Sequence, residues 1–178
     1  GDTLKLNNTL NGARCYIAVS GGLKVKSIFG SKAFFSNITD SYFLKKNDEI
    51  KVSKKSKNKI LKWDRFNFKL NRSIEVFKGP EFDLLSSNSK NKLFKNEFTI
   101  STNNRMAYNL VEKLQVGTKS IISSPVLPGS VQLTPSGKMI ILHRDCQTTG
   151  GYPRILQLNI SSLNYLSQLK STDKIKLR

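Results

Sequence analysis

Turn-forming residues divide the second half of the chain into segments that are too short for long helices. The turns are marked by Pro125, Pro128-Gly129, residues 135–137 and Gly150-Gly151. Proline removes a backbone donor and glycine tolerates turn conformations, so such positions tend to end regular elements. Between them lie short apolar or alternating runs at residues 131–133, 139–142 and 154–159, as is typical of strands. The pattern predicts a mainly β fold.

The first half and the C-terminus contain similar short runs. The further strands that we predict are residues 15–19, 48–53, 73–77, 97–100, 106–110 and 174–178. Residues 15–19 form a compact apolar run closed by Gly21-Gly22, which predicts a buried strand followed by a turn. Residues 48–53 alternate polar and apolar side chains, which predicts a half-buried strand. Residues 54–71 combine a polar loop pattern with an extended stretch.

Two segments predict short helices. Residues 82–95 offer spaced apolar contacts, although Asn and Ser weaken the middle of this segment. Residues 161–169 predict a second helix that is capped by Ser161 or Ser162. Many short strands combined with two short helices favour a β-barrel.

The length of 178 residues fits one domain or two small barrels that share an interface. A hydrophobic fraction of 38% is sufficient for a packed core. The sequence has no apolar run long enough to span a bilayer and no start of the secretory type. We therefore expect a soluble cytoplasmic protein with no membrane partner.

The formal net charge of +18 favours contact with anions. Lysines are densest at residues 51–62, where aromatic residues are sparse. The sequence lacks helix-turn-helix, RNP and zinc-finger patterns, which are the usual companions of a nucleic-acid-binding surface. A solvated lysine-rich surface is thus favoured over a nucleic-acid partner.

Two cysteines and one histidine provide little metal or nucleophile chemistry. Cys15 and Cys146 are far apart in the sequence, and with His143 they do not form a zinc-binding set. We expect both thiols to be reduced. His143 ends an apolar strand, which favours a structural role, and Cys146 has no neighbouring base that would make it a nucleophile.

Two adjacent stretches carry a resemblance to a known family. Residues 126–137 read Val-Leu-Pro-Gly-Ser-Val-Gln-Leu-Thr-Pro-Ser-Gly, and residues 145–155 read Asp-Cys-Gln-Thr-Thr-Gly-Gly-Tyr-Pro-Arg-Ile. Supporting pieces lie in the same order at residues 13–22, 29–31 and 104–110. This ordered set resembles the biotin-dependent carboxyltransferase / allophanate hydrolase subunit 2 family. That family includes the C subunit of 5-oxoprolinase, the antikinase-associated protein KipA and one half of the carboxyltransferase region of urea carboxylase.

The resemblance implies a cyclophilin-like β-barrel and a non-autonomous enzyme component. The implied activity is the ATP-dependent hydrolysis of 5-oxoproline to glutamate, together with a KipI-like B component and an A component of the same enzyme. ATP would act at the assembled complex. Two alternatives stay open: a carboxyltransferase component, for which biotin would come from another chain, and a KipA-like regulatory protein that binds an inhibitor of a histidine kinase.

Two departures from the family pattern limit what is carried over. Residues 32–34 are Lys-Ala-Phe, where family members usually have Arg-Ser-Thr, which weakens any anion contact at that place. The N-terminal Gln-Asp-Gly-Arg-type motif of the family is also absent from this sequence. We therefore expect residues 1–178 to represent the C-terminal part of a family member and to be inactive alone.

The resemblance places the candidate substrate- or nucleotide-binding residues in two patches. They are Arg144, Gln147, Thr148, Thr149, Gly150, Gly151 and Tyr152 in the first patch, and Pro128, Gly129 and Gln132 in the second. Activating a lactam amide with ATP requires cations for phosphate charge and positioned donors for a developing oxyanion. Arg144 and Arg154 flank the motif and could grip an anion, while the amide, hydroxyl and glycine backbone groups could orient a ligand.

Each of these residues also has a structural interpretation. Gly150-Gly151 followed by proline is an ordinary tight turn, and the threonines could satisfy backbone groups within it. Asp145 is more readily a partner for Arg144 or for turn amides than a general base. Arg105 and Tyr108 are expected on opposite faces of a strand, so that one of them could reach the site.

Overall fold

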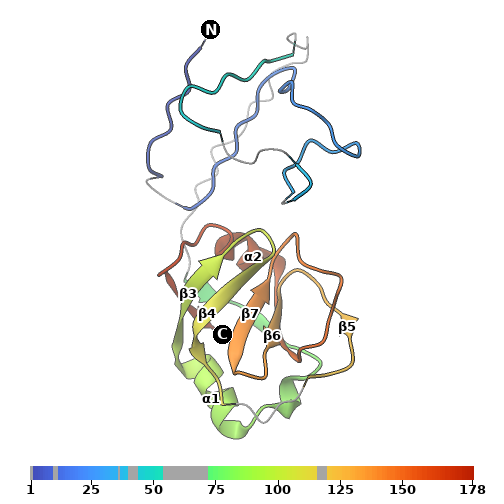
Figure 1. The fold of residues 1–178 in the computed structure, drawn as a ribbon. Coiled ribbons are helices and arrows are strands. Elements are labelled where there is room, and N and C mark those ends of the chain that lie inside the picture. Colours follow the sequence, from blue (N-terminus) through green and yellow to red (C-terminus); the bar gives the residue numbers. More distant parts are fainter. Residues whose placement is uncertain (1, 10–11, 36, 40–43, 54–71, 116–119) are drawn as a thin grey trace. The chain divides into compact units, whose positions relative to one another are not determined.

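The computed structural model describes residues 2–9, 12–35, 37–39, 44–53, 72–115 and 120–178. The chain divides into two compact units, of which one comprises Gly1–Arg14 with Asn67–Arg178 and the other comprises Cys15–Phe66. The first unit contains all of the described helices and strands (Figure 1). It is therefore the part of the chain that positions the candidate site.

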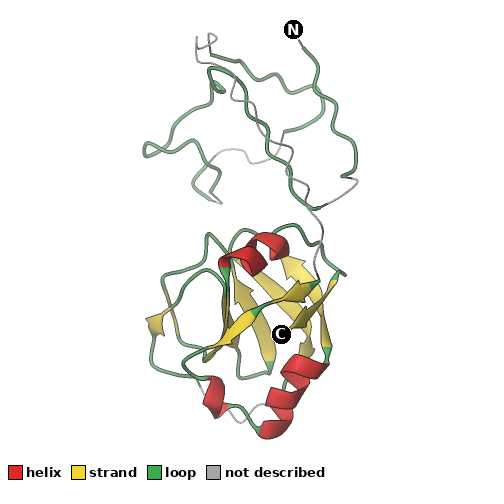
Figure 2. Cartoon of the chain, turned by 180° about the vertical axis from the view of Figure 1, so that it is seen from behind, coloured by secondary structure: helices red, strands yellow, loops and turns green. Residues whose placement is uncertain are grey.

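The first unit is built on one eight-stranded sheet with the strand order β1-β10-β3-β4-β7-β6-β9-β2. Figure 1 shows β3, β4, β7 and β6 side by side in this sheet, and Figure 2 shows the same unit from behind. Its strands are β1 (Ser73–Ile74), β2 (Val76–Lys78), β3 (Glu97–Asn103), β4 (Ala107–Lys113), β6 (Ser130–Leu133), β7 (Lys138–Leu142), β9 (Arg154–Leu158) and β10 (Lys174–Leu177). A separate two-stranded ribbon pairs β5 (Ser124–Pro125) with β8 (Thr149–Gly150). Among the strands of the described residues, only the β1–β10 pairing is parallel.

The sheet is nearly closed, because its two outer strands are consecutive in the chain. β1 and β2 are separated by Glu75 alone, yet β1 pairs with β10 and β2 pairs with β9. The Val76 N–H donates to the Arg178 carbonyl (2.9 Å), and the Gly79 N–H donates to the Ile155 carbonyl (2.9 Å). One extended segment thus satisfies both edges of the sheet, which would otherwise present unpaired backbone groups. The prediction of a mainly β barrel is confirmed.

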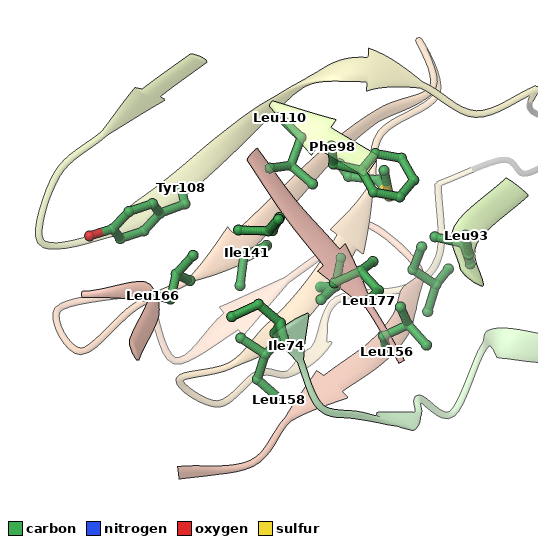
Figure 3. Close-up of a cluster of buried hydrophobic side chains, with 14 of the residues drawn as sticks. Ile74, Leu93, Phe98, Tyr108, Leu110, Ile141, Leu156, Leu158, Leu166 and Leu177 are labelled. Atoms are coloured by element: carbon green, nitrogen blue, oxygen red, sulfur yellow. The ribbon is translucent and has the colours of Figure 1, made fainter. Parts of the chain in front are cut away.

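The alternating strand patterns fill the barrel with apolar side chains. In β3, Phe98 and Ile100 are buried while their neighbours are partly or fully exposed, as the two-residue period of a strand requires. β6 is buried along its whole length, because it lies between β7 and β9. Figure 3 shows side chains of β1, β3, β4, β7, β9, β10 and both α-helices meeting in one core cluster.

The first predicted helix is divided into two pieces. A 3-10 turn at Phe82–Leu84 precedes α1 (Ser87–Lys95), whose N-cap Ser86 accepts a hydrogen bond from the Ser89 N–H through its side chain (3.2 Å). The serine and asparagine residues that weaken the middle of the predicted helix therefore begin a new one.

The second predicted helix is α2 (Ile160–Leu166), and its predicted cap was wrong. The Asn159 side chain accepts from the Ser162 N–H at 2.7 Å and so occupies the capping position expected for Ser161 or Ser162. Ser162 itself is buried and accepts from the Glu75 N–H at 2.8 Å. Within the described ranges, the helices are too short and too polar to cross a bilayer.

The described part of the second unit contains isolated β-bridges instead of strands. These bridges join Leu23 with Val52 and Ile28 with Ser31. The predicted strands at residues 15–19 and 48–53 were therefore wrong: Tyr16 is 86% exposed, and no ladder extends beyond the single bridge at Val52 among the described residues. Apolar runs form stable strands only when neighbouring strands satisfy the backbone and a core covers one face. The predictions for residues 54–71, and most of the lysine-rich segment, lie outside the described residues.

Candidate functional site

The family-like motif at residues 145–155 runs beside residues 121–126. The short strands β5 and β8 pair in antiparallel register, with Ser124 opposite Gly150. The Val126 N–H donates to the Thr148 carbonyl (3.0 Å), and the Ile121 N–H donates to the Gly151 carbonyl (2.9 Å). The backbone of the motif is thus held by hydrogen bonds that leave the Thr148 and Thr149 side chains exposed.

Gln132, a residue of the second predicted patch, contacts the first patch from the buried strand β6. This side chain is only 2% exposed, and it reaches the motif from the buried strand β6. Its amide nitrogen donates to the Tyr152 carbonyl (3.3 Å), and its amide oxygen lies 3.5 Å from the Gln147 amide nitrogen. Because a buried amide is costly without partners, these contacts order the motif from within the barrel.

Gly150 is required by this close approach. A Cβ atom at Gly150 would lie 2.5 Å from the Gln132 amide nitrogen, a distance that demands displacement of that side chain. The neighbouring Gly151 has more room, since its Cβ would meet only the Ile121 carbonyl oxygen, at 3.4 Å. The two glycines are therefore unequal: Gly150 admits Gln132 to the motif, whereas Gly151 has the geometry of an ordinary turn.

Pro128 and Gly129 form a packed turn that contacts a different glutamine. The Gly129 N–H donates to the Leu142 carbonyl at 2.8 Å, with a positive φ of 92°. The Gln157 amide donates to the Pro128 carbonyl at 2.9 Å, and a Cβ at Gly129 would lie 2.6 Å from that amide nitrogen. These packing contacts account for the proline and the glycine of this turn without a ligand. Of the second patch, Gln132 is the residue that contacts the motif.

Arg154 is committed to an ion pair, contrary to the expectation that it could grip a bound anion. Its guanidinium donates twice to the Glu81 carboxylate (2.9 and 2.6 Å) and once to the Pro125 carbonyl (2.8 Å). The Arg154 N–H donates to the same carboxylate at 2.8 Å. Hydrogen bonds from Arg154 lower the pKa of Glu81, although burial opposes this shift. Arg154 thus ties β9 to the 3-10 turn and to β5.

Sequence reasoning missed Glu81, which is the partner that explains Arg154. The two residues are 73 positions apart, and an isolated acidic residue after Gly79-Pro80 offers no local sign of a long-range pair. An imbalance of charge could have given a hint, since acidic residues are scarce in this basic chain.

Arg144 is an exposed cation immediately before the motif. Its guanidinium donates to the Asn164 side-chain oxygen on α2 at 3.3 Å. Asp145 pairs with Arg105 (2.9 Å) rather than with Arg144, which corrects the predicted pairing. Arg105 lies in the turn before β4 rather than within the strand, so the expectation of opposite strand faces for Arg105 and Tyr108 was also wrong.

His143 is buried next to this face and has an unusual environment. It is 5% exposed, and its ring lies 5.4 Å from the buried ring of Tyr108, at 44°. Neither ring nitrogen has a hydrogen-bond partner among the described residues. Burial, followed by the charges of Arg14 and Arg144, lowers the pKa of His143, whereas Asp145 and the backbone of Arg105 oppose the shift. The expected structural role explains its burial, but not its unpartnered nitrogens.

The remaining reactive groups offer little catalytic chemistry. Both cysteines are free thiols, and burial raises the pKa of Cys146, which disfavours the nucleophilic thiolate. In the part of the chain that the structure describes, no three His, Cys, Asp or Glu side chains are grouped as a metal site requires. The exposed polar side chains at the motif are Arg144 immediately before it and Asp145, Gln147, Thr148, Thr149 and Tyr152 within it.

Comparison with protein families identifies relatives along the whole chain. A family model described as carboxyltransferase domain, subdomain A and B, matches residues 1–178. The chain is 28% identical over 176 residues to the C subunit of 5-oxoprolinase from Escherichia coli K12, covering 95% of this chain and 57% of that protein. It is 34% identical over 106 residues to the corresponding protein of Haemophilus influenzae, covering 58% of this chain and 34% of that protein. The matched part of the chain thus spans just over half the length of the first relative and about a third of the length of the second.

Solved structures share the fold at lower sequence identity. A crystal structure of TTHA0988 matches with a TM-score of 0.62 and 20% identity, covering 73% of this chain and 26% of that chain. The urea amidolyase of K. lactis matches with a TM-score of 0.55 and 19% identity, covering 59% of this chain and 7% of that chain. These similarities support the barrel architecture; the more specific description as cyclophilin-like stays a prediction.

Proposed function

Because the chain belongs to the family of carboxyltransferase domains, subdomains A and B, we propose that it is a component of an ATP-dependent 5-oxoprolinase. In this proposal it contributes to the hydrolysis of 5-oxoproline to glutamate, together with the A and B components of that enzyme. Support comes from the alignment with the C subunit of the E. coli enzyme, which covers 95% of this chain. The chain spans 57% of that relative, so the complete activity is assigned to the full-length protein within its complex.

One structural observation supports the proposal: the buried Gln132 amide contacts the motif at the Tyr152 carbonyl and at the exposed Gln147 side chain. Gln132 holds the backbone at Tyr152 and approaches Gln147, while the side chains of Thr148 and Thr149 stay accessible. A row of donors fixed in advance can stabilise an oxygen as negative charge develops on it, without having to reorganise. Such a row fits the carbonyl of a lactam that is being opened.

Arg144, immediately before the motif, is the residue that fits a phosphate group. It is exposed, and its side chain already points to a neutral acceptor, Asn164, rather than to a carboxylate. A guanidinium can bind two oxygens of a phosphate with parallel hydrogen bonds. ATP would supply a phosphoryl group that, once on the lactam oxygen, makes the carbonyl carbon more electrophilic toward water, so that the ring C–N bond breaks after the new C–O bond forms, while Arg144 would orient the phosphate. Arg154 is not available for this role, because Glu81 binds it.

The proposal excludes a covalent nucleophile on the described residues of this chain. The Cys146 thiol has a raised pKa, and the Asp145 carboxylate is paired with Arg105. The chain would thus bind and orient the substrate, and the partner subunits would supply the remaining groups. This division of roles agrees with our expectation that the chain is inactive alone.

The test is the release of ADP by the full-length protein assembled with its partner subunits, with and without 5-oxoproline. We expect turnover that depends on 5-oxoproline and that falls about 100-fold in Gln147→Ala or Arg144→Ala, which is the usual effect of removing a transition-state donor. Lys138→Ala changes an exposed lysine on β7 and serves as the control. An assembled complex without 5-oxoproline-dependent turnover would refute the assignment.

Carboxyl transfer is the second candidate, and the description of the family model favours it. The same donors could hold the carbonyl of carboxybiotin or of urea, with biotin delivered by another chain. Transfer of a labelled carboxyl group from carboxybiotin to an acceptor, measured with the same assembled protein, distinguishes this reaction from 5-oxoproline hydrolysis. The KipA-like regulatory role stays a prediction, for which binding of a partner protein without turnover would be the sign.

A further inference from the structure

Three segments that are distant in the sequence meet at a second polar surface region of the barrel unit. They are residues 12–14, the end of β3 and the connection between α2 and β10. Between them lies an open hollow of about 470 Å³, lined by Ala13, Arg14, Asn103, Lys170 and Ser171. None of these lining residues belongs to the motif at residues 145–155, so the hollow is not explained by the proposed reaction.

The hollow is held together by one glutamine. The side-chain oxygen of Gln168 accepts hydrogen bonds from the backbone N–H groups of both Ala13 (3.1 Å) and Arg14 (3.2 Å). Gly12 precedes them with a positive φ of 77°, and a Cβ at this position would lie 2.6 Å from the same oxygen. On the other side, the Asn103 amide donates to the Leu169 carbonyl at 3.1 Å. These hydrogen bonds fix the position of the Arg14 backbone at the edge of the hollow.

Two cations line this hollow and use neutral acceptors. The Arg14 guanidinium donates to the Asn104 carbonyl (3.1 Å), and the Lys170 ammonium donates to the Thr9 hydroxyl (3.1 Å). Within the described residues, no carboxylate forms an ion pair with either side chain. The nearby Asp173 carboxylate accepts from the Lys170 backbone N–H instead (2.8 Å). Two like charges brought to one place favour the binding of an anion there.

An aromatic residue connects this hollow with the buried histidine. The Arg14 guanidinium carbon lies 5.7 Å from the centre of the Tyr108 ring, a typical cation–π distance, and the His143 ring lies near the same tyrosine. His143 is more than nine-tenths buried, with both ring nitrogens unpartnered in the described part of the chain. Arg14, Tyr108 and His143 therefore form a connected row from the hollow into the barrel.

We propose that the hollow is a binding site for a small oxyanion, held by Arg14 and Lys170, and that His143 responds to its occupancy. The ligand class is a carboxylate or a phosphate group, because Arg14 offers two parallel donors and Lys170 a compact positive charge. Ser171 and Asn103 also line the hollow, and their side chains carry donors that suit an acceptor-rich ligand.

The electrostatic consequence for His143 has a definite sign. The neutral form of this residue is favoured by burial and then by the positive charges of Arg14 and Arg144, which together lower its pKa. Asp145 and the polar backbone of Arg105 act in the opposite direction and raise this pKa. An anion beside Arg14 offsets one of the two positive charges, and occupancy of the hollow therefore raises the pKa of His143.

The test uses the fact that His143 is the only histidine in the chain. The protein is prepared with isotope-labelled histidine, and the single imidazole resonance is followed by NMR. Inorganic phosphate and 5-oxoproline are titrated in separate experiments, with chloride added to keep the ionic strength constant. We expect a saturable shift and a higher pKa of His143 with at least one ligand; the ligand that saturates identifies whether phosphate or carboxylate is bound.

Variants separate the hollow from general surface charge. Lys170→Gln removes an exposed charge without disturbing the core, and we expect about tenfold weaker binding, as for the loss of one charged hydrogen bond. Arg14→Ala should weaken binding at least as much. Lys138→Gln removes an exposed lysine on β7, at the end of that strand opposite His143, and should leave the affinity unchanged.

Two results would overturn this proposal. One is a shift that grows linearly with either anion, and the other is a saturable shift that Lys170→Gln and Lys138→Gln alter equally. Neither result depends on turnover of 5-oxoproline, so failure of the oxyanion site and failure of the proposed enzymatic function are recorded by different measurements.

Discussion

Two apolar runs of the chain have similar composition and different outcomes. Residues 139–142 lie within β7, where β4 and β6 pair with them on both sides and the barrel core buries Ile141 and Leu142. Residues 15–19 are also apolar, but they form no strand, and Tyr16, Ile17 and Val19 are exposed. The difference shows that an apolar run is able to form a strand, but that it forms one only where neighbouring strands pair with it.

The two units as wholes also differ in how far their apolar side chains are buried. Within the barrel unit, side chains from seven strands and two α-helices contribute to one continuous core. In the described residues between 15 and 53, no side chain is buried, and apolar residues such as Phe29 and Phe35 are exposed. We therefore expect substitutions of apolar residues to be costly in the barrel and nearly neutral in residues 15–53.

The largest expected effect is the loss of core packing at Ile141. Ile141→Ala should lower the free energy of unfolding by about 2–5 kcal/mol, because it removes buried methyl groups and leaves a cavity. Ile17→Ala, made in an exposed part of residues 15–19, should change it by less than about 0.5 kcal/mol. Urea unfolding of both variants measures the difference. Equal effects would show that residues 15–19 are packed as tightly as β7.

A smaller effect is expected from the pair that anchors β9. Glu81→Gln should lower the free energy of unfolding by about 1.5–3 kcal/mol, the usual value of hydrogen bonds to a charged group. The pKa of Glu81 is lowered in the folded protein, so its contribution is complete above the pKa of an unfolded glutamate and is lost as pH falls through the folded value. Urea unfolding at neutral and acidic pH should show the variant converging on the parent protein at low pH.

The matched control is Glu97→Gln, which alters an exposed carboxylate 3.9 Å from Lys174. Its effect should be below about 0.5 kcal/mol at all pH values, as is usual for exposed pairs. A Glu97 effect as large as that of Glu81 would contradict the anchoring role of the pair between Glu81 and Arg154.

Alanine substitutions of the two motif glycines should differ in their cost in stability, by less than the effects above. Gly150→Ala displaces the Gln132 amide and breaks its bond to the Tyr152 carbonyl, which should cost about 1–3 kcal/mol. Gly151→Ala has room for its methyl group and should cost less than about 1 kcal/mol. Thermal unfolding of the two variants gives the comparison; equal stability would mean that Gln132 is free to move away.

The smallest expected effect distinguishes the observed helix cap from the predicted one. Asn159→Ala should lower the free energy of unfolding by about 1 kcal/mol, because it removes the acceptor of the Ser162 N–H. Ser161→Ala should be nearly neutral, since Ser161 is exposed within α2. Unfolding curves that rank the two substitutions in the reverse order would restore the predicted cap.

Local patterns allowed much of the barrel to be predicted. β6, β7 and β9 were found because glycine and proline separate them and because their side chains are apolar or alternate. Gln132 was expected only as a possible site residue of the second patch, and its contact with the Tyr152 carbonyl was found in the structure. These features depend on residues that are close in the sequence.

Features that depend on distant partners could not be predicted in this way. Arg154 was interpreted as a free cation because Glu81 lies 73 residues away, and Asp145 was paired with its neighbour Arg144 rather than with Arg105. The row formed by Arg14, Tyr108 and His143 likewise combines three separate segments. Strand pairing brings such distant residues into contact. The pairing cannot be predicted from residue spacing or from composition.

The most direct test of the proposed site is the rate of 5-oxoproline-dependent ADP release by the assembled complex that contains Gly150→Ala or Gly151→Ala. If the donors that Gln132 orders form the site, Gly150→Ala lowers the rate about 100-fold, as a misplacement of about 1 Å does, while Gly151→Ala stays within about threefold of the parent protein. Equal rates for the two variants in a correctly assembled, active complex would contradict the placement of the site at this motif.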